Sequence, residues 1–328
     1  MMLKRVWAEQ LFACGCALLE AGHPRLALWH LARAARIKTS DPDYQYAAAF
    51  AANHARDRIQ AARFCDRTLE LDPGFVPAHE LLDGLFLHGE DYISVLRRLH
   101  QHLRPRTYVE IGVESGHSLR LVQPGTIALG VDPQPLITAP LPEGARVFAE
   151  TSDEFFAGHD VRAELGGLPV DLALIDGMHH FEYALRDFVN LERLCGPESI
   201  ILVHDCFPYS RLTAKRERAL GFWSGDVWRL VPLLKKYRPD LSIETIATPP
   251  TGLGVVRRLD PSSRFLDENV ERLCEEFLAL DYGFLDRDRA ADLNLFPNDW
   301  DKIRALLSAP FRAARGGSEN SAGPARFP

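Results

Sequence analysis

Tyr108-Val-Glu-Ile-Gly-Val-Glu-Ser-Gly-His-Ser118 is the stretch that decides the fold of this chain. Its first four residues predict a buried strand, and Gly112 and Gly116 predict a turn directly after it. Ser115 or Ser118 can cap a helix that follows the turn. The pattern therefore predicts a strand, a glycine turn and a helix, in that order.

The glycine turn suits a nucleoside ligand that carries no phosphate. Gly112 allows a close backbone approach, and Glu110 can accept hydrogen bonds from hydroxyl or ammonium groups. A dinucleotide site, G-x-G-x-x-G, requires a second glycine where this chain has Glu114, whose carboxylate would repel a phosphate. A positively charged ligand such as S-adenosylmethionine fits better. The alternative is an ordinary strand, turn and helix that bind nothing.

The composition is that of a globular protein with more than one domain. The chain has 328 residues, of which 46% are hydrophobic and 25% charged. A net charge of -7 argues against general affinity for nucleic acid. Scattered cysteines indicate reduced thiols in a cytoplasmic protein. The apolar run at residues 11–19 is short and flanked by acids, so we expect neither a secretory signal nor a membrane span.

Residues 1–103 are rich in alanine and predict a helical domain with an internal repeat. Ala27 and Ala61 lie 34 residues apart, as do Leu31 and Cys65. A 34-residue period with small residues at helix crossings resembles tetratricopeptide repeats. Such units stack on one another. The domain therefore either offers a groove to a partner protein or is a plain helical bundle that shields one end of the next domain.

Strands and helices alternate after residue 104, which predicts a mostly parallel, doubly wound α/β sheet of the Rossmann-like kind. Seven strands are predicted, at 107–111, 127–131, 145–149, 171–175, 199–203, 242–247 and 252–258. The last two are separated by only a few residues, including Pro249 and Pro250, and so form an antiparallel pair at the sheet edge. Seven strands ending in such a hairpin are the layout of class I methyltransferases. The predicted segments are a helical repeat domain at 1–103, the sheet domain at 104–260, a helical extension at 261–314 and a disordered tail at 315–328.

Acidic and hydroxyl residues after the second and third strands are candidates for cofactor binding. Asp132 lies 22 residues after Glu110. In nucleotide-binding α/β folds, an acid at about this spacing binds the ribose hydroxyls. The alternative is an aspartate that caps a turn before Pro133. After the third strand, Ser152 and Asp153 either bond the amino group of adenine or cap the next helix.

The densest group of polar residues follows the fourth and fifth strands. Asp176 and His179 follow one strand, and His204 and Asp205 follow the next, so both pairs reach the edge where ligands bind. Asp176 and Asp205 suit Mg²⁺ or Mn²⁺, with His204 as a softer third ligand. Such a metal would lower the pKa of a substrate hydroxyl, and His179 could take the proton. Alternatively, these side chains cap helices and bond one another.

The segment from 206 to 240 is longer than a simple crossover helix requires. It combines several basic residues with Trp223 and Trp228, and would form a lid or an acceptor wall. The alternative is an amphipathic helix packed on the sheet. We favour this alternative for Trp228, whereas Trp223 stays open.

Residues 106–206 also resemble a known family. The matching motifs are Val-Glu-Ile-Gly-Val-Glu-Ser-Gly-His-Ser118, Gly-Val-Asp132, Ile-Asp-Gly-Met-His179 and Val-His-Asp205. They resemble the S-adenosylmethionine-dependent methyltransferases that include macrocin O-methyltransferase and cephalosporin hydroxylase. The resemblance implies that the first two motifs contact the cofactor, and that Asp176, His179 and Asp205 form the metal and base site. Met178 and His204 stand where acids are frequent in that family. These departures weaken the expectation of a bound metal more than the expectation of a bound cofactor.

We therefore expect a methyltransferase that uses S-adenosylmethionine to methylate a hydroxyl of a small molecule or sugar. His179 would be the general base, with or without a metal. Glu110 would hold the methionyl end, beside Gly112, Gly116 and Ser118 of the same turn. Two alternatives stay open: a non-catalytic cofactor-binding scaffold whose repeats recruit a protein, and a metal-dependent, hydroxylase-like member of the same fold. The identity of the acceptor and any homo-oligomer are also left open.

Overall fold

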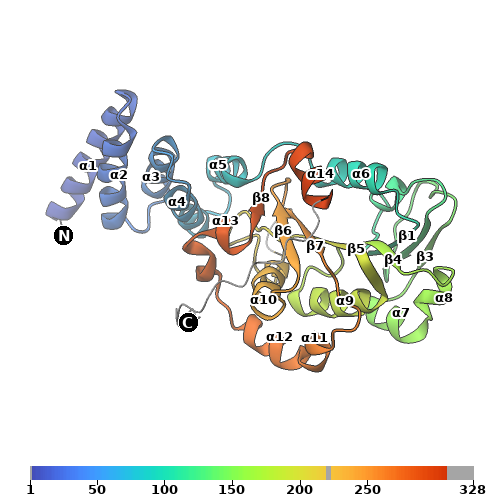
Figure 1. Cartoon of the computed structure of the whole chain (residues 1–328). Helices are drawn as coiled ribbons and strands as arrows, with labels where there is room; N and C mark the ends of the chain where they lie inside the picture. The colour runs from blue at the N-terminus through green and yellow to red at the C-terminus, as the bar shows by residue number, and fades with distance from the viewer. Residues whose placement is uncertain (1, 219–222, 309–328) are drawn as a thin grey trace, which may run out of the picture.

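The computed structural model describes residues 2–218 and 223–308, as a row of helices followed by a sheet covered on both faces (Figure 1). The helices before the sheet are α1 (Met2–Glu20), α2 (Pro24–Ile37), α3 (Pro42–His54), α4 (Arg58–Leu71), α5 (Val76–Phe86) and α6 (Tyr92–Leu103). The starts of α2, α4 and α6 follow one another at intervals of 34 residues. This spacing agrees with the predicted period, and the tetratricopeptide assignment stays a prediction.

The first helices pack closely because small residues lie at their crossings. A Cβ added to Gly15 of α1 would lie 2.5 Å from the Leu31 side chain of α2. Ala27, on the same helix as Leu31, is fully buried. Aspartate caps the start of α4. The carboxylate of Asp57 accepts a hydrogen bond from the backbone N–H of Gln60 in the first turn of this helix.

Eight strands form one sheet in the order β3-β2-β1-β4-β5-β7-β6-β8. They are β1 (Thr107–Ile111), β2 (Ile127–Val131), β3 (Ala145–Phe148), β4 (Val170–Ile175), β5 (Cys195–His204), β6 (Ser242–Ile246), β7 (Leu253–Arg257) and β8 (Leu295–Phe296). Only β7 runs antiparallel to its neighbours, so the predicted antiparallel pair is confirmed. The predicted count of seven strands is wrong, because two residues of β8 add to the edge beside β6, and a strand that short leaves no periodic signal.

Successive residues of the central strands face two separate cores. On one face, Tyr108 and Leu172 pack with α6 and with α14 (Trp300–Ser308). On the other face, Val109 and Ala173 pack with α9 (Phe181–Leu194) and α10 (Leu230–Tyr237). Figure 1 shows the first pair of helices above the sheet and the second pair below it. The remaining helices are α7 (Ser152–Gly158), α8 (Val161–Glu164), α11 (Phe265–Glu268), α12 (Val270–Leu278) and α13 (Arg289–Asp292), with 3-10 turns at η1 (Leu119–Leu121), η2 (Val227–Arg229) and η3 (Tyr282–Asp286).

The α-helix predicted after the glycine turn is absent from the described structure, which has only the single 3-10 turn η1 there. Neither serine caps that turn. The Ser118 hydroxyl donates to Glu110 instead, and the Ser115 hydroxyl bonds His117. The face that a crossover helix would cover is already occupied by α6, which packs beside Leu119 of η1.

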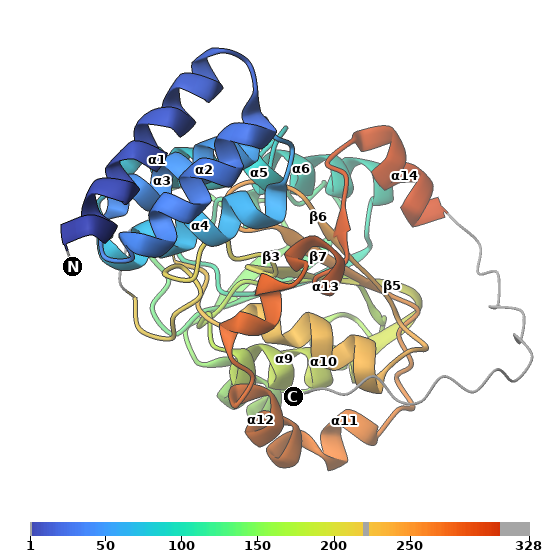
Figure 2. The ribbon, with the colours of Figure 1, turned by 90° about the vertical axis from the view of Figure 1, so that its left-hand side faces the viewer.

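Buried polar contacts join the N-terminal helices to the sheet and its C-terminal extension. Asp66 of α4 pairs with Arg289 of α13 across 2.7 Å, and both side chains are buried. Asp66 also accepts from the backbone N–H of Arg211, and Arg289 donates to the carbonyl of Tyr209. Figure 1 shows α1 at the far end of the row, with α4 and α5 between it and the sheet, and Figure 2 views the molecule from the α1 end. The helical row is therefore fixed to the sheet at α4, α5 and α6.

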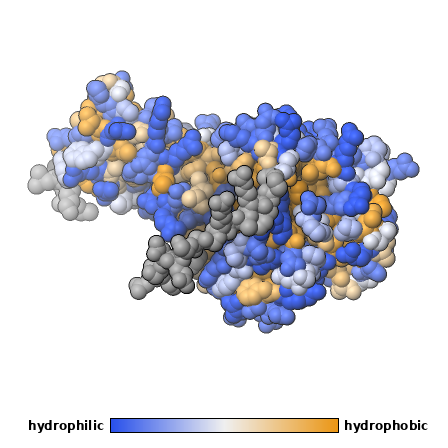
Figure 3. Space-filling model, in the orientation of Figure 1, coloured by the Kyte–Doolittle hydropathy of each residue, from blue (hydrophilic) through white to orange (hydrophobic). Residues whose placement is uncertain are grey.

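Three remaining expectations concern the chain as a whole. Among the described residues, no helix combines the length and apolar character that a bilayer crossing requires. All six cysteines are free thiols. The tail predicted to be disordered, residues 315–328, lies outside the described residues. Figure 3 colours the described residues by hydropathy.

Candidate active site

A cavity of about 900 Å³ lies at the carboxyl edge of the sheet. Its wall includes residues that follow β1, β2, β3, β4 and β5, together with Tyr92 of α6 and Trp223. Glu110 and Gly116 are the predicted site residues that do not line it. Those that do are Gly112, Ser118, Asp132, Ser152, Asp153, Asp176, His179, His204 and Asp205. The topology thus gathers most of the predicted site around one space.

The glycine turn is held against the loop that follows β4. Gly112 has a φ of +88°, and a Cβ there would overlap the backbone carbonyl of Asp176. The same two loops are joined by a hydrogen bond from the Asp176 N–H to the Ile111 carbonyl, at 2.8 Å. Glycine is therefore required by the neighbouring backbone, and not by a ligand as its place in the sequence suggested.

Glu110 lies behind the cavity wall. Its carboxylate accepts hydrogen bonds from the Tyr108 hydroxyl at 2.7 Å and the Ser118 hydroxyl at 2.6 Å. Burial raises the pKa of Glu110 to about 8, although both hydrogen bonds act to lower it. Ser118 lines the cavity, so Glu110 can act on a ligand there by fixing the hydroxyl of Ser118.

Asp132 ties the glycine turn to the end of β2. One carboxylate oxygen accepts from the backbone N–H groups of Val113 and Glu114, at 3.0 and 2.7 Å. The other accepts from the N–H of Gln134 at 2.8 Å. Asp132 thus caps the turn before Pro133 and also faces the cavity. A carboxylate has about four acceptor sites, so ribose hydroxyls could bind in addition.

The loop after β3 begins α7 with a residue that the sequence did not single out. Thr151 is the N-cap, in a capping box with Glu154, so the alternative that Ser152 or Asp153 caps this helix is wrong. Asp153 instead forms an ion pair with Arg186 of α9, at 2.9 Å.

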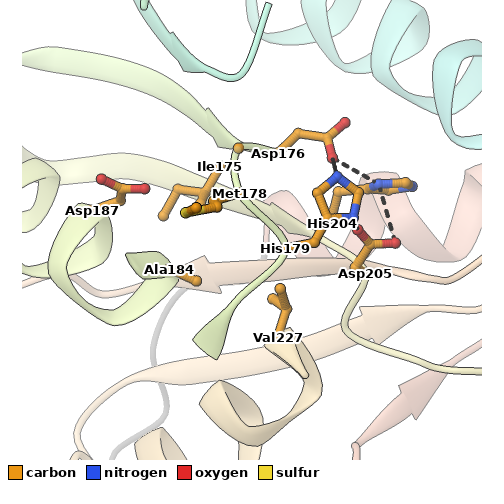
Figure 4. Close-up of a pocket in the computed structure, with 10 residues that line it drawn as sticks. Ile175, Asp176, Met178, His179, Ala184, Asp187, His204, Asp205 and Val227 are labelled. Carbon is orange, nitrogen blue, oxygen red and sulfur yellow. Dashed lines mark hydrogen bonds and ion pairs between the residues drawn. The ribbon is translucent and has the colours of Figure 1, made fainter. Parts of the chain in front are cut away.

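The two acid and histidine pairs come together at the other end of the cavity (Figure 4). His179 Nδ1 lies 2.6 Å from Asp205 Oδ2, and its Nε2 lies 3.7 Å from Asp176 Oδ1. His204 Nδ1 lies 3.0 Å from Asp176 Oδ1. The acids and histidines therefore do bond one another, as one alternative predicted. They are the same residues that the other alternative predicted to be functional.

Mutual charge sets the protonation of this cluster. Burial alone would lower the pKa of His179, but the charge and hydrogen bond of Asp205 and the charge of Asp176 raise it to about 9. Burial likewise opposes charge on Asp205, yet His204 and His179 hold its pKa below the usual value. The charges of the cluster therefore favour the protonated form of His179.

Three further side chains hold the cluster in place: Trp223, which the sequence analysis left open, and Thr251 and Tyr92, which no motif indicated. Thr251 donates its hydroxyl to Asp205 at 2.6 Å. Tyr92 stacks on His204 with ring centroids 4.0 Å apart, and Trp223 stacks on His179 at 5.2 Å and an interplanar angle of 6°. Tyr92 comes from the helical segment before the sheet, so no local pattern could have connected it to the site. Trp228, by contrast, is buried in the core as favoured.

The same cluster offers a candidate metal site. One ligand atom each from Asp176, His179 and Asp205 lie within 4.8 Å of one another. Two carboxylates and an imidazole fit Mn²⁺, and Mg²⁺ if waters complete its shell. A metal would bind neutral His179, so a cation and the imidazole proton exclude each other. The three-residue group does not include His204, which bonds Asp176 from the side.

Residues 109–206 match a protein family described as a methyltransferase domain. The match runs from β1 to the residue after Asp205 and covers less than half of the chain. No curated protein matches the chain.

Several solved structures are similar to part of this chain, with low TM-scores. The cofactor-bound protein Rv0187 from MTB is 17% identical, with a TM-score of 0.42, over 62% of this chain and 98% of that one. The O-methyltransferase TomG from Streptomyces achromogenes, solved with SAM, is 16% identical, with a TM-score of 0.40, over 62% of this chain and 90% of its own. An O-methyltransferase from Bacillus cereus, in complex with SAH, is 14% identical, with a TM-score of 0.36, over 54% of this chain and 86% of its own. TM-scores this low carry no argument about the site.

Proposed function

We propose that this protein is an S-adenosylmethionine-dependent methyltransferase that acts on a hydroxyl of a small molecule or sugar. The observation that carries the proposal is one cavity with two different ends, lined mostly by residues of the segment that matches a methyltransferase domain. One end follows β1, β2 and β3 and suits a nucleoside, and the other holds the acid and histidine cluster. A volume of about 900 Å³ is at the upper end of the usual range for ligand pockets, which leaves room for a cofactor and an acceptor.

The charge of the cavity favours a cationic cofactor. Glu114 and Asp132 line the nucleoside end, where a phosphate would be repelled and a sulfonium or ammonium group attracted, whereas the charge of Asp153 is paired with Arg186. Asp132 is the residue we assign to the ribose hydroxyls. Glu110 acts from behind the wall: it accepts the Ser118 hydroxyl hydrogen, which leaves the Ser118 oxygen to accept from the ammonium group of the methionyl end.

His179 is the residue we assign to the acceptor proton. Its Nδ1 is engaged by Asp205, which leaves Nε2 as the nitrogen for the acceptor hydroxyl. The acceptor oxygen attacks the cofactor methyl group in line, the carbon–sulfur bond breaks to leave a neutral thioether, and His179 receives the hydroxyl proton. His179 must be neutral at that moment, which the raised pKa disfavours at neutral pH. A Mg²⁺ or Mn²⁺ held by Asp176 and Asp205 would lower the pKa of the acceptor hydroxyl. If His179 were the third ligand, it would hold the metal and would not act as the base.

Aromatic rings shape the acceptor end. Tyr92 and Trp223 lie against the two histidines and line the cavity there, so they present flat apolar walls around the reactive nitrogen. Such walls hold a phenol or a sugar ring face-on.

The proposal is tested by supplying radiolabelled S-adenosylmethionine with a panel of phenols and sugars. The wild type should transfer label to at least one acceptor, and His179→Gln should bind the cofactor with unchanged affinity but transfer at least about a hundredfold more slowly. Cofactor binding without transfer to any acceptor would favour the scaffold alternative. A His179→Gln variant as active as the wild type would remove the base assignment.

A further inference from the structure

Asp187 of α9 is a buried acid that the mechanism above does not use. It is 3% exposed and lines the same cavity. Its Oδ1 has no hydrogen-bond partner, and among the described residues Asp187 is the only cavity-lining residue with such a buried side-chain atom. In Figure 4 its carboxylate extends from the helix toward Ile175 and Met178, apart from the histidine cluster.

A buried acceptor without a donor is uncommon in native proteins, and at a cavity wall it points to a donor on the ligand. Its surroundings define that donor. The hydroxyl of Ser152 interacts with Asp187, and the apolar side chains of Ile175 and Ala184 lie beside it. Burial raises the pKa of Asp187 to about 7, which agrees with a site that awaits a hydrogen-bonding partner.

The position along the sheet edge indicates which part of the ligand reaches this acid. Ser152 follows β3, at the opposite end of the β3-β2-β1-β4-β5 order from Asp205, which follows β5. A nucleoside laid along this edge with its reacting sulfur at the cluster, and its ribose at Asp132, therefore brings its base toward Ser152. Asp153 is a poorer partner for the base, because Arg186 engages both of its oxygens.

We propose that Asp187, together with Ser152, recognises the exocyclic amino group of the purine base of the cofactor. This inference rests on the proposed function and deepens it. Once ionised, the Asp187 carboxylate can only accept hydrogen bonds, so it bonds an amino group and repels a carbonyl oxygen at the same position. Above its raised pKa of about 7, Asp187 would therefore make the pocket select adenine over hypoxanthine.

The test is calorimetric titration of the full chain, at a pH above the raised pKa of Asp187, with S-adenosylhomocysteine and with S-inosylhomocysteine, in which a carbonyl replaces the amino group. The wild type should prefer the adenine compound by about tenfold or more. Asp187→Asn has nearly the same shape and can donate to the carbonyl, so the preference should fall to about threefold or less. Asp301→Asn is the control, since Asp301 is an exposed acid outside the cavity wall, and it should keep the wild-type preference.

The outcomes of this titration distinguish the role of Asp187 from the proposed function. Tight binding of the adenine compound with an unchanged preference in Asp187→Asn would overturn the role of Asp187 and leave the proposed function standing. Failure of the wild type to bind either compound would overturn both. If Asp187→Asn does not fold, Ser152→Ala takes its place and should lower the affinity for the adenine compound alone.

Discussion

The backbone carbonyl of Asp176 occupies the space where a side chain on Gly112 would begin. The turn after β1 and the turn after β4 are therefore locked together, and the second of these turns carries the metal and base candidates. This contact therefore fixes the position of the nucleoside end of the cavity relative to the reactive end.

Replacing Gly112 by alanine should consequently disrupt both ends. The new Cβ would overlap the Asp176 carbonyl, and a φ of +88° is strained for any residue with a side chain. We expect loss of cofactor binding in calorimetry and a lower melting temperature. Gly158→Ala is the control, because a Cβ there meets nothing within 4 Å, and it should be neutral or stabilising. A Gly112→Ala protein that binds the cofactor normally would contradict this contact.

Asp66→Ala should destabilise the joint between the N-terminal helices and the rest of the chain. The change leaves Arg289 as a buried charge without its carboxylate partner. Breaking a buried pair in this way costs about 3–5 kcal/mol, measurable by chemical denaturation. Asp301→Ala removes an exposed pair with Arg304 instead and should change the unfolding free energy by less than about 1 kcal/mol. Equal effects from the two substitutions would show that burial of the Asp66 pair is unimportant.

The stability of the ligand-free protein should depend on pH through Asp187. Burial raises its pKa from 3.8 to about 7, so the folded state keeps a proton that the unfolded state has already lost. The stability linked to this group is full below about pH 4 and is lost as the pH rises toward 7. The difference in melting temperature between Asp187→Asn and the wild type should therefore shift in favour of the variant across this range. A difference that is constant with pH would argue against a neutral, buried Asp187.

Manganese binding should distinguish the roles of the two acid and histidine pairs. We expect the wild type to bind Mn²⁺, followed by electron paramagnetic resonance, and Asp205→Asn to weaken it by about tenfold or more. His204→Gln should have a smaller effect, because His204 is outside the three-residue group. Absence of Mn²⁺ binding in the wild type would remove the metal from the proposal, and a larger loss in His204→Gln would restore His204 as a ligand.

The strands and the acids at their ends could be predicted because their signals are local. Each central strand is a short apolar run bounded by turn residues, and parallel strands bring the residues at their carboxyl ends to one edge of the sheet. Asp132, Asp176 and Asp205 could therefore be assigned to a common cavity, which they do line.

The supporting residues could not be predicted, because they depend on tertiary contacts. Tyr92 reaches His204 from a helix that precedes the whole sheet, and Thr251 reaches Asp205 from the loop between β6 and β7. The helix predicted after the glycine turn is absent for a related reason, because α6 already covers that face of the sheet. The hydroxyls of Ser118 and Ser115 bond Glu110 and His117 and do not cap a helix.

Calorimetric titration of the purified chain with S-adenosylhomocysteine tests the central claim most directly. The wild type should bind with micromolar affinity, and Asp132→Ala should lose about 1–3 kcal/mol of binding free energy from missing hydrogen bonds to a charged group. Asp301→Ala, which changes an exposed acid outside the cavity wall, should bind like the wild type. No heat of binding from the wild type would contradict the methyltransferase assignment.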